Sequence, residues 1–527
     1  MTIVVRIGWV GYATRRCMLF VSSLIYSLSF TSCKPSFPEL PPDSPKDTYV
    51  LISQSVFYGK KRVTVDYGTI SVPENRGKGV SRLIQLPFIR ARALSDSSDV
   101  PVFALSGGPG NSNLTWDLEH MLPLLLKHDF IMVGYRGVDG SMVLDCPEVV
   151  EALDGSLPLS DESMKKVGKA WKKALERMKS EGIDLDGYTI METIDDLEAV
   201  RKVLGYPRIN LLSRSYGTRV AYLYSLRYPE SLYRSAMIGV NPPGRFVWES
   251  SMIDNQLRQY SELWAANPLM VRKSKDLYES MKGILQKMPE QWMGIPISKD
   301  KVRVVAFAML YHRKTAAMVF DSFVAAERGD ASGLAMMSAA FDFVMPRMMI
   351  WGDALKAVSS DFDSLRNYNA ESQPSEDYPM GSPLNKLLWG PLEYGHLSIK
   401  PIPEIYRTHR PTQVETLLLS GNLDFSTPAQ YATVELLPFL EKGRQIILSD
   451  CGHTADVLNP GVGNAVPLLR AYYENGIYLL PSARYIPMDF TVNWGFPLLA
   501  KIVLALAVLV FCLLIYLLTR VIRRYIR

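Results

Sequence analysis

Short apolar runs alternate with segments of helical periodicity in the first half of the chain. Residues 100–105 and 130–133 are apolar runs followed by Gly-rich loops, and residues 208–212 form a similar run. Residues 193–204 place apolar side chains at helical spacing behind a Thr, with acidic residues in the first turn. This alternation predicts parallel strands connected by crossover helices.

Two other patterns flank this region. Residues 62–70 and 83–93 alternate apolar and polar positions around the turn-rich segment PENRGKG, which predicts an antiparallel hairpin. Residues 245–400 are rich in helical patterns, and apolar strands resume at residues 416–420 and 445–448. We interpret residues 245–400 as a helical cap inserted in an α/β core, with an independent domain as the alternative.

The C-terminal end has the pattern of a transmembrane helix. Residues 502–519 are an unbroken uncharged run, extended upstream by residues 496–500 beyond the single Lys501. The residues 520–527 that follow are rich in arginine, and this excess of positive charge predicts a cytoplasmic tail. The body of the protein would then lie outside the cytoplasm, attached to the membrane.

The N-terminal end is typical of an export signal. Arginines at positions 6, 15 and 16 precede an uncharged run over residues 17–33, and a Pro-rich stretch follows. We therefore predict a signal peptide or lipoprotein signal over residues 1–33 and a spacer over residues 34–58. The residues Phe-Thr-Ser before Cys33 resemble a lipoprotein cleavage box, and lipidation of Cys33 stays open.

Composition adds two constraints. Of the 527 residues, 48% are hydrophobic and 21% charged, which is typical of a globular protein with a large core, and a net charge of +5 does not indicate a nucleic-acid partner. The body contains only Cys146 and Cys451, so one disulfide bond or two free thiols are both open.

A candidate nucleophile lies between a predicted strand and a predicted helix. Residues 211–217 read Leu-Leu-Ser-Arg-Ser-Tyr-Gly, the context of a nucleophile elbow, and they place Ser215 at its centre. The tight turn requires small residues two positions before and after the nucleophile. Gly217 meets this requirement, and Ser213 stands where glycine is commoner.

An acid and a base follow in the expected chain order. Asp424 lies in the loop after the strand at residues 416–420, and His453 lies in the loop after the next strand. Asp450 is the rival acid but is too close in sequence to His453. The alternative for Asp424 is a turn former that caps a helix. Because both residues follow the helical segment, an independent domain is the less favoured interpretation of residues 245–400.

The segment Ser-Gly-Gly-Pro-Gly at residues 106–110 follows another predicted strand. Its glycines allow a substrate to approach the backbone, so we predict an oxyanion hole formed by the N–H groups of Gly108 and Tyr216. A plain turn is the alternative. This chemistry requires no metal ion and no organic cofactor.

These motifs together resemble the prolyl iminopeptidase and tripeptidyl aminopeptidase group of serine peptidases. The resemblance spans most of residues 60–460 and includes YGTISVPENR, SGGPG, YRG, SRSYG, GNLDFSTP and CGH. It implies the α/β-hydrolase fold, with a mostly parallel central sheet flanked by helices and an inserted helical cap. The apolar run near the C-terminus adds a transmembrane helix to this fold. Two departures, Ser106 and the pair Gly134-Tyr135, put the detailed substrate preference in doubt.

The resemblance also implies an activity. We expect an aminopeptidase that uses Ser215, Asp424 and His453 to cleave residues or short peptides from free N-termini. In such enzymes acidic cap residues hold the substrate amine, and Glu327, Asp330 or Asp361 could serve here, with a charge on a solvated helix face as the favoured alternative for each. The alternatives are an esterase or lipase and, less favoured, a non-catalytic binding module.

The predicted organisation follows from these assignments. The core occupies residues 59–244 and 401–485, and the cap occupies residues 245–400 between them. The transmembrane helix covers residues 496–519 and the basic tail residues 520–527.

Overall fold

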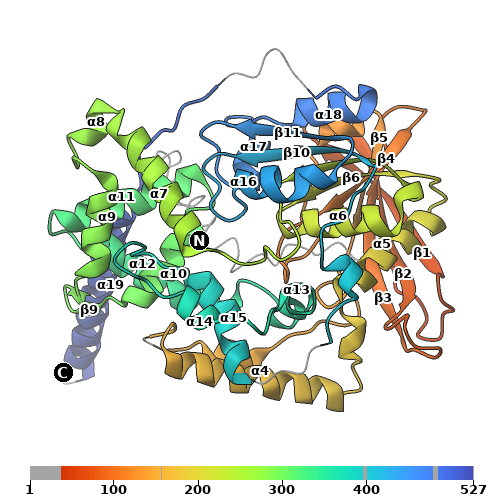
Figure 1. Cartoon of the computed structure of the whole chain (residues 1–527). Coiled ribbons are helices and arrows are strands. Elements are labelled where there is room, and N and C mark those ends of the chain that lie inside the picture. Colours follow the sequence, from red (N-terminus) through yellow and green to blue (C-terminus); the bar gives the residue numbers. More distant parts are fainter. Residues whose placement is uncertain (1–36, 156, 396–399, 479–484, 526–527) are drawn as a thin grey trace, which may run out of the picture.

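A sheet of nine strands lies on the right in Figure 1. The computed structural model describes residues 37–155, 157–395, 400–478 and 485–525. The strand order is β1-β2-β3-β5-β4-β6-β7-β10-β11. The strands are β1 (Tyr49–Tyr58), β2 (Lys61–Pro73), β3 (Leu83–Ala91), β4 (Asp99–Leu105), β5 (His128–Val133), β6 (Ile209–Arg214), β7 (Leu232–Ile238), β10 (Glu415–Gly421) and β11 (Gly443–Leu448).

The sheet is antiparallel at one end and parallel over the rest. Strands β1, β2 and β3 pair antiparallel, which confirms the predicted hairpin of β2 and β3, and β3 also runs antiparallel to β5. All neighbouring pairs from β5 to β11 are parallel. Because parallel strands end at one edge, the loops after β4, β6, β10 and β11 meet there.

Helices cover both faces of the sheet. One face carries α5 (Ile190–Val203) and α6 (Tyr216–Arg227), whose apolar side chains belong to the larger hydrophobic cluster. The other face carries α2 (Leu122–Leu125) and α18 (Val466–Asn475), whose side chains belong to the second cluster. This layering buries the sheet on both sides, as a mostly parallel sheet requires.

The chain between β7 and β10 is mostly helical and lies beside and below the sheet in Figure 1. A short hairpin of β8 (Gln291–Trp292) and β9 (Ile295–Pro296) interrupts it. Its helices are α7 (Ser250–Ala265), α8 (Pro268–Val271), α9 (Leu277–Gln286), α10 (Lys299–Met309), α11 (Arg313–Glu327), α12 (Ser332–Val344), α13 (Leu355–Asp361), α14 (Tyr368–Glu371) and α15 (Pro383–Gly395).

Helices from outside this segment extend the same layer. Helix α4 (Asp161–Ser180), which follows α3 (Pro147–Ala152) and precedes β6, packs against α15. The helical layer therefore draws on residues from two distant parts of the chain. The remaining short helices, α16 (Ala429–Tyr431) and α17 (Thr454–Leu458), lie in the loops after β10 and β11.

A buried ion pair joins the sheet layer to the helical segment. Arg219 of α6 and Asp361 at the end of α13 lie 2.7 Å apart, and neither side chain is exposed to solvent. Arg219 also donates to the backbone carbonyl of Asn241, and the Gly244 N–H donates to Asp361. These additional hydrogen bonds are what a fully desolvated charge pair needs to be stable.

The C-terminal helix α19 (Phe496–Tyr525) is long and apolar enough to cross a membrane. Its first turns pack against α11 and α12, where Phe496 and Leu499 are buried. Lys501 forms an ion pair with Asp330 at 2.6 Å. The predicted apolar span therefore begins directly at the helical segment, and α19 extends away from it in Figure 1.

Two sequence predictions need correction. Helix α5 starts earlier than predicted, because the Thr189 hydroxyl, and not Thr193, caps it by accepting the Glu192 N–H at 3.3 Å.

Strand β1 occupies the last ten residues of the predicted spacer, because it pairs along its length with β2. The predicted signal segment and Cys33 lie outside the described residues.

Cys146 and Cys451 are both free and buried, so the predicted alternative of a disulfide bond between them is wrong. Burial raises the pKa of each thiol to about 12. Two reduced thiols kept out of solvent act here as small apolar side chains.

The Asp361→Ala variant should lower the free energy of unfolding by about 3–5 kcal/mol, because it leaves the buried Arg219 guanidinium without its counter-ion. Denaturant titration of the purified protein measures this difference. The matched control is Glu371→Ala, which removes the partly exposed partner of Arg366 and should cost less than about 1 kcal/mol. Equal losses in the two variants would contradict the assignment.

Neither Cys146 nor Cys451 should react with iodoacetamide in the folded protein at pH 8, because burial raises both thiol pKa values to about 12. Mass spectrometry of tryptic peptides, before and after unfolding in guanidinium, measures the modified fraction. Rapid modification of either thiol in the folded protein would show that its side chain is accessible.

Candidate active site

Ser215 lies at the turn between β6 and α6, in the position that the sequence predicts. Its φ of 54° and ψ of −129° are strained for a residue with a side chain. Its N–H donates to the Ile238 carbonyl at the end of β7 at 2.8 Å. This backbone geometry is typical of a sharp strand-to-helix turn that presents a serine hydroxyl above the sheet.

Small residues on both sides make this turn possible. A Cβ atom on Gly217 would lie 2.6 Å from the carbonyl oxygen of Leu105, so no larger residue fits there without a shift of β4. Ser213 tolerates its extra atoms because its hydroxyl donates to the carbonyl of Ala236 in β7 at 3.1 Å. A serine can therefore stand where glycine is commoner.

Asp424 is buried in the loop after β10 and accepts hydrogen bonds at both carboxylate oxygens. The Ser426 and Thr427 N–H groups donate to Oδ1 at 2.9 and 3.0 Å. The Thr427 hydroxyl donates to Oδ2 at 2.6 Å. Burial by itself would raise the pKa of Asp424, but the adjacent His453 and these hydrogen bonds hold that pKa below its ordinary value.

His453 follows β11 and precedes α17. Its Nδ1 lies 2.7 Å from Oδ2 of Asp424 and 3.2 Å from the Thr427 hydroxyl. The backbone N–H of His453 donates to the backbone carbonyl of Tyr311 at 2.8 Å. The Tyr311 ring packs edge-on against the imidazole at a centroid distance of 5.1 Å. These contacts fix the ring with Nδ1 toward the carboxylate, which leaves Nε2 free to act on another group.

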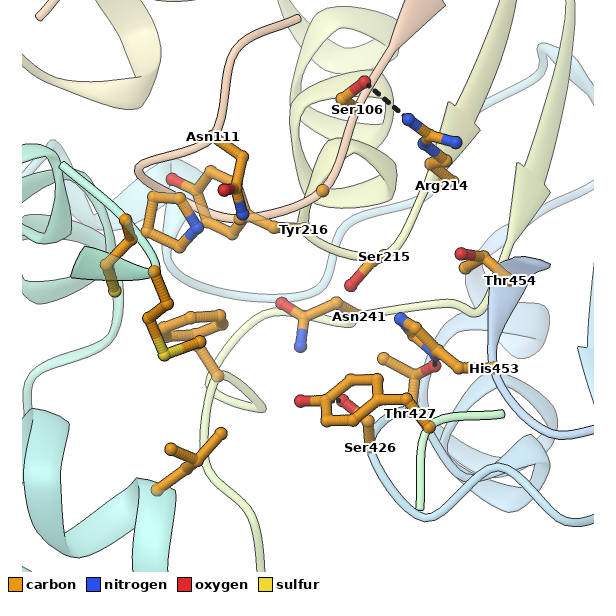
Figure 2. A pocket seen from close by; sticks show the side chains of 18 of the residues that line it. Ser106, Asn111, Arg214, Ser215, Tyr216, Asn241, Ser426, Thr427, His453 and Thr454 are labelled. Carbon is orange, nitrogen blue, oxygen red and sulfur yellow. Dashed lines mark hydrogen bonds between the residues drawn. The ribbon is translucent and has the colours of Figure 1, made fainter. Parts of the chain in front are cut away.

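Ser215 and His453 both line a cavity of about 440 Å³. Figure 2 shows the two side chains next to each other on its wall. Asp424 is 1% exposed and does not line the cavity, so it lies behind the imidazole. The structure thus brings together the three residues that the sequence singled out from separate loops.

The Gly-rich loop after β4 lies against this serine. A Cβ atom on Gly107 would lie 2.7 Å from the Ser215 Cβ, so only glycine permits this approach. The Gly110 N–H donates to the buried Asp353 carboxylate at 2.8 Å, which ties the loop to the helical segment. Gly108 lines the cavity, and Tyr216 is the first residue of α6, where a backbone N–H has no partner within the helix.

Aromatic and aliphatic side chains form a large part of the cavity wall. Two cations, Arg214 and Arg245, also line it, and none of the described lining residues is Asp or Glu. Arg245 is neutralised by Glu249 and Glu435, at 2.5 and 2.6 Å. The apolar lining residues include Phe246, Trp248, Met348, Met349, Trp351, Leu384, Leu387 and Leu388.

The three acidic residues suggested by the family resemblance lie elsewhere. Asp361 pairs with Arg219, Asp330 pairs with Lys501, and Glu327 accepts a hydrogen bond from Ser280 at 2.8 Å. None of the three lines the cavity that contains Ser215. Their assignment as ligands of a substrate amine is therefore wrong for this cavity, because each is held in a contact of its own.

A family model described as alpha/beta hydrolase fold matches residues 100–268. The chain has the α/β-hydrolase fold. The matched residues of this hydrolase fold include Ser215, the Gly-rich loop and the strands that hold them.

Known proteins confirm the predicted resemblance. The tripeptidyl aminopeptidase of Streptomyces coelicolor is 24% identical over 207 residues, which are 37% of this chain and 38% of the relative. The serine protease Hip1 of Mycobacterium tuberculosis is 25% identical over 272 residues, 48% of this chain and 46% of the relative. The matches thus span less than half of these relatives. A proline iminopeptidase structure from Mycobacterium smegmatis aligns over 80% of this chain and 97% of its own, with 12% identity and a TM-score of 0.36.

Three residues of this α/β-hydrolase site were not singled out by sequence reasoning. Thr427 contacts both Asp424 and His453, Gly107 contacts Ser215, and Arg214 lines the cavity. Thr427 and Gly107 lie inside motifs that had been recognised, so their motifs were the available signal. Arg214 also lies inside a recognised motif, directly before Ser215, but nothing in the sequence shows that it has no acidic partner.

The Asp424→Asn variant should lose stability in a pH-dependent way. Because the folded-state pKa of Asp424 lies below the unfolded value of about 4, its carboxylate stabilises the fold above that pH. This contribution is lost as the pH falls through the folded-state pKa. The difference in unfolding free energy between wild type and variant should therefore be constant at neutral pH and shrink below about pH 4.

Denaturant titrations across the acidic range measure this difference. The matched control is Asp96→Asn, because Asp96 is exposed and makes no hydrogen bond or ion pair in the described part of the chain. That control should show no pH-dependent difference. A constant deficit for Asp424→Asn at all pH values would contradict the role of the ionised carboxylate.

Proposed function

We propose that this protein is a serine hydrolase of the aminopeptidase type, with Ser215 as nucleophile, His453 as general base and Asp424 as the acid that orients it. The observation that carries the proposal is the pairing of His453 Nδ1 with the buried Asp424 at 2.7 Å, beside Ser215 on one cavity wall (Figure 2). A strained serine, an oriented imidazole and a buried carboxylate support acyl transfer.

In the proposed reaction, Nε2 of His453 accepts the Ser215 proton as the serine oxygen attacks the substrate carbonyl carbon. The scissile bond breaks when His453 gives this proton to the leaving group, and a water activated by the same base then hydrolyses the acyl-enzyme. The N–H groups of Gly108 and Tyr216 stabilise the oxyanion, which the position of the Gly-rich loop beside Ser215 supports.

The named relatives support a peptide substrate. One is a tripeptidyl aminopeptidase and the other a serine protease, and the proposed substrate is accordingly a short peptide with a free N-terminus. An esterase is the second candidate, favoured by a largely apolar cavity that lacks a lining carboxylate among the described residues. A carboxylate is the usual partner of a substrate ammonium group, so its absence from the wall weighs against amine recognition there.

The proposed location is the outer side of a membrane. Helix α19 is apolar enough to span a bilayer, and Arg520, Arg523 and Arg524 follow its apolar stretch. An excess of basic residues favours the cytoplasmic side, so the catalytic body would lie on the opposite side.

The Ser215→Ala variant should lose hydrolysis by at least about a thousandfold, because the nucleophile is removed. The measurement compares wild type and variant on peptides with free and acetylated N-termini and on simple esters. Turnover that requires both Ser215 and a free amine supports an aminopeptidase. Ester cleavage without peptide cleavage would instead leave an esterase, and no Ser215-dependent turnover would indicate a binding module.

A further inference from the structure

Arg214 differs from the other cation of the cavity because it has no carboxylate partner. It immediately precedes Ser215 and lines the same cavity. Its only hydrogen bond in the described structure is from Nη2 to the Ser106 hydroxyl at 3.2 Å, and no acidic group within the described residues forms an ion pair with it. Arg245 on the same wall is paired with two glutamates.

The Arg214 side chain is held in place from one side. Its guanidinium lies over the Trp116 ring at 4.2 Å from the ring centroid, a cation–π contact that orients the planar group. Figure 2 shows the side chain pointing toward Ser106 of the Gly-rich loop and away from the Ser215 hydroxyl. The contacts with Trp116 and Ser106 thus hold the guanidinium in a fixed arrangement in the wall of the cavity that also contains Ser215.

Partial burial of a cation without an anionic partner costs free energy, because the charge loses contact with water. Burial lowers the pKa of Arg214, and no neighbouring carboxylate opposes this effect. The fully buried Arg136 and Arg219 are each paired with a carboxylate at 2.7 Å. The chain thus compensates these interior cations with its own acids, whereas beside the nucleophile the compensating anion is absent from the described protein.

We propose that Arg214 is an anion subsite that binds a carboxylate of the substrate in the cavity that contains Ser215. The planar guanidinium matches a carboxylate, which can accept two parallel hydrogen bonds from it. This inference rests on the proposed hydrolase function and specifies its substrate class, namely peptides with an acidic side chain or a free terminal carboxylate in the cavity.

The test is the ratio of kcat/KM for matched charged and neutral substrates of the full-length protein in detergent. One arm compares Ala-Ala-Glu-p-nitroanilide with Ala-Ala-Gln-p-nitroanilide, which differ only in the side-chain charge. The other arm compares tetra-alanine with its C-terminal amide. In one of the two pairs, kcat/KM of wild type should be about tenfold or more higher for the charged substrate than for the neutral one. That pair shows whether Arg214 binds a side-chain carboxylate or the C-terminal carboxylate.

The Arg214→Met variant should bring this ratio close to one, and Arg214→Lys should retain part of the preference because it keeps the charge without the planar fork. A structural role in packing Trp116 would lower both members of a pair equally and leave the ratio unchanged. The matched control is Arg208→Met, an exposed arginine just before the opposite end of β6, which removes the same charge outside the cavity. Its ratio should equal that of wild type.

A binding measurement separates this proposal from the proposed function. Glutarate should raise the melting temperature of wild type and of Ser215→Ala more than neutral glutaramide does, and Arg214→Met should lose this difference. A shift without any hydrolysis would support the anion subsite while the hydrolase proposal fails. Equal effects of glutarate and glutaramide on wild type, or an unchanged substrate ratio in a folded Arg214→Met, would overturn the subsite.

Discussion

The strained turn at Ser215 is the constraint on which the site depends. A serine with a φ of 54° persists only where the surroundings hold it, and here the neighbouring strand β7 accepts its N–H. Gly217 packs directly against the end of β4, so the turn also requires that strand to end at the same level. The three adjacent strands thus determine the position of the hydroxyl, and the loops after β10 and β11 bring the other two residues to it.

Buried charges connect this sheet to the helical segment. Arg219 pairs with Asp361, and Asp353, paired with Lys356, holds the backbone of Gly110. One contact lies four residues from Ser215, at Arg219, and the other lies in the Gly-rich loop itself, at Gly110. The geometry of the cavity therefore depends on the packing of the helical segment as much as on the sheet, because removing either partner would leave an unpaired charge in the interior.

The helical segment also connects the cavity to the C-terminal helix. Met348 and Met349 follow α12 and line the cavity, whereas α12 itself packs against the first turns of α19. The Lys501–Asp330 ion pair lies at this junction. A helix apolar enough to cross a membrane is thus attached to the layer that forms one wall of the cavity, not to the sheet.

Local sequence determined much of this protein. The strands, the turn at Ser215 and the order of Ser215, Asp424 and His453 follow from short apolar runs, small residues and loop positions, which act within a few residues. Helix ends were less predictable, because Thr189 and Thr193 each stand three residues before an acidic residue, and only the structure shows that Thr189 accepts the Glu192 N–H. Strand β1 was assigned to the spacer although its sequence is rich in strand-forming residues, and its pairing with β2 shows that it belongs to the sheet.

Only the tertiary structure decided which charges are free. Arg214, Arg219 and Arg245 are alike in sequence, yet two of them find acids from the helical segment or beyond it and one finds none. The acids proposed for the substrate amine were excluded for the same reason, since each already has a partner. The ion pairs Arg219–Asp361, Arg245–Glu435 and Asp330–Lys501 join residues more than a hundred positions apart, so these partners meet only once the chain is folded.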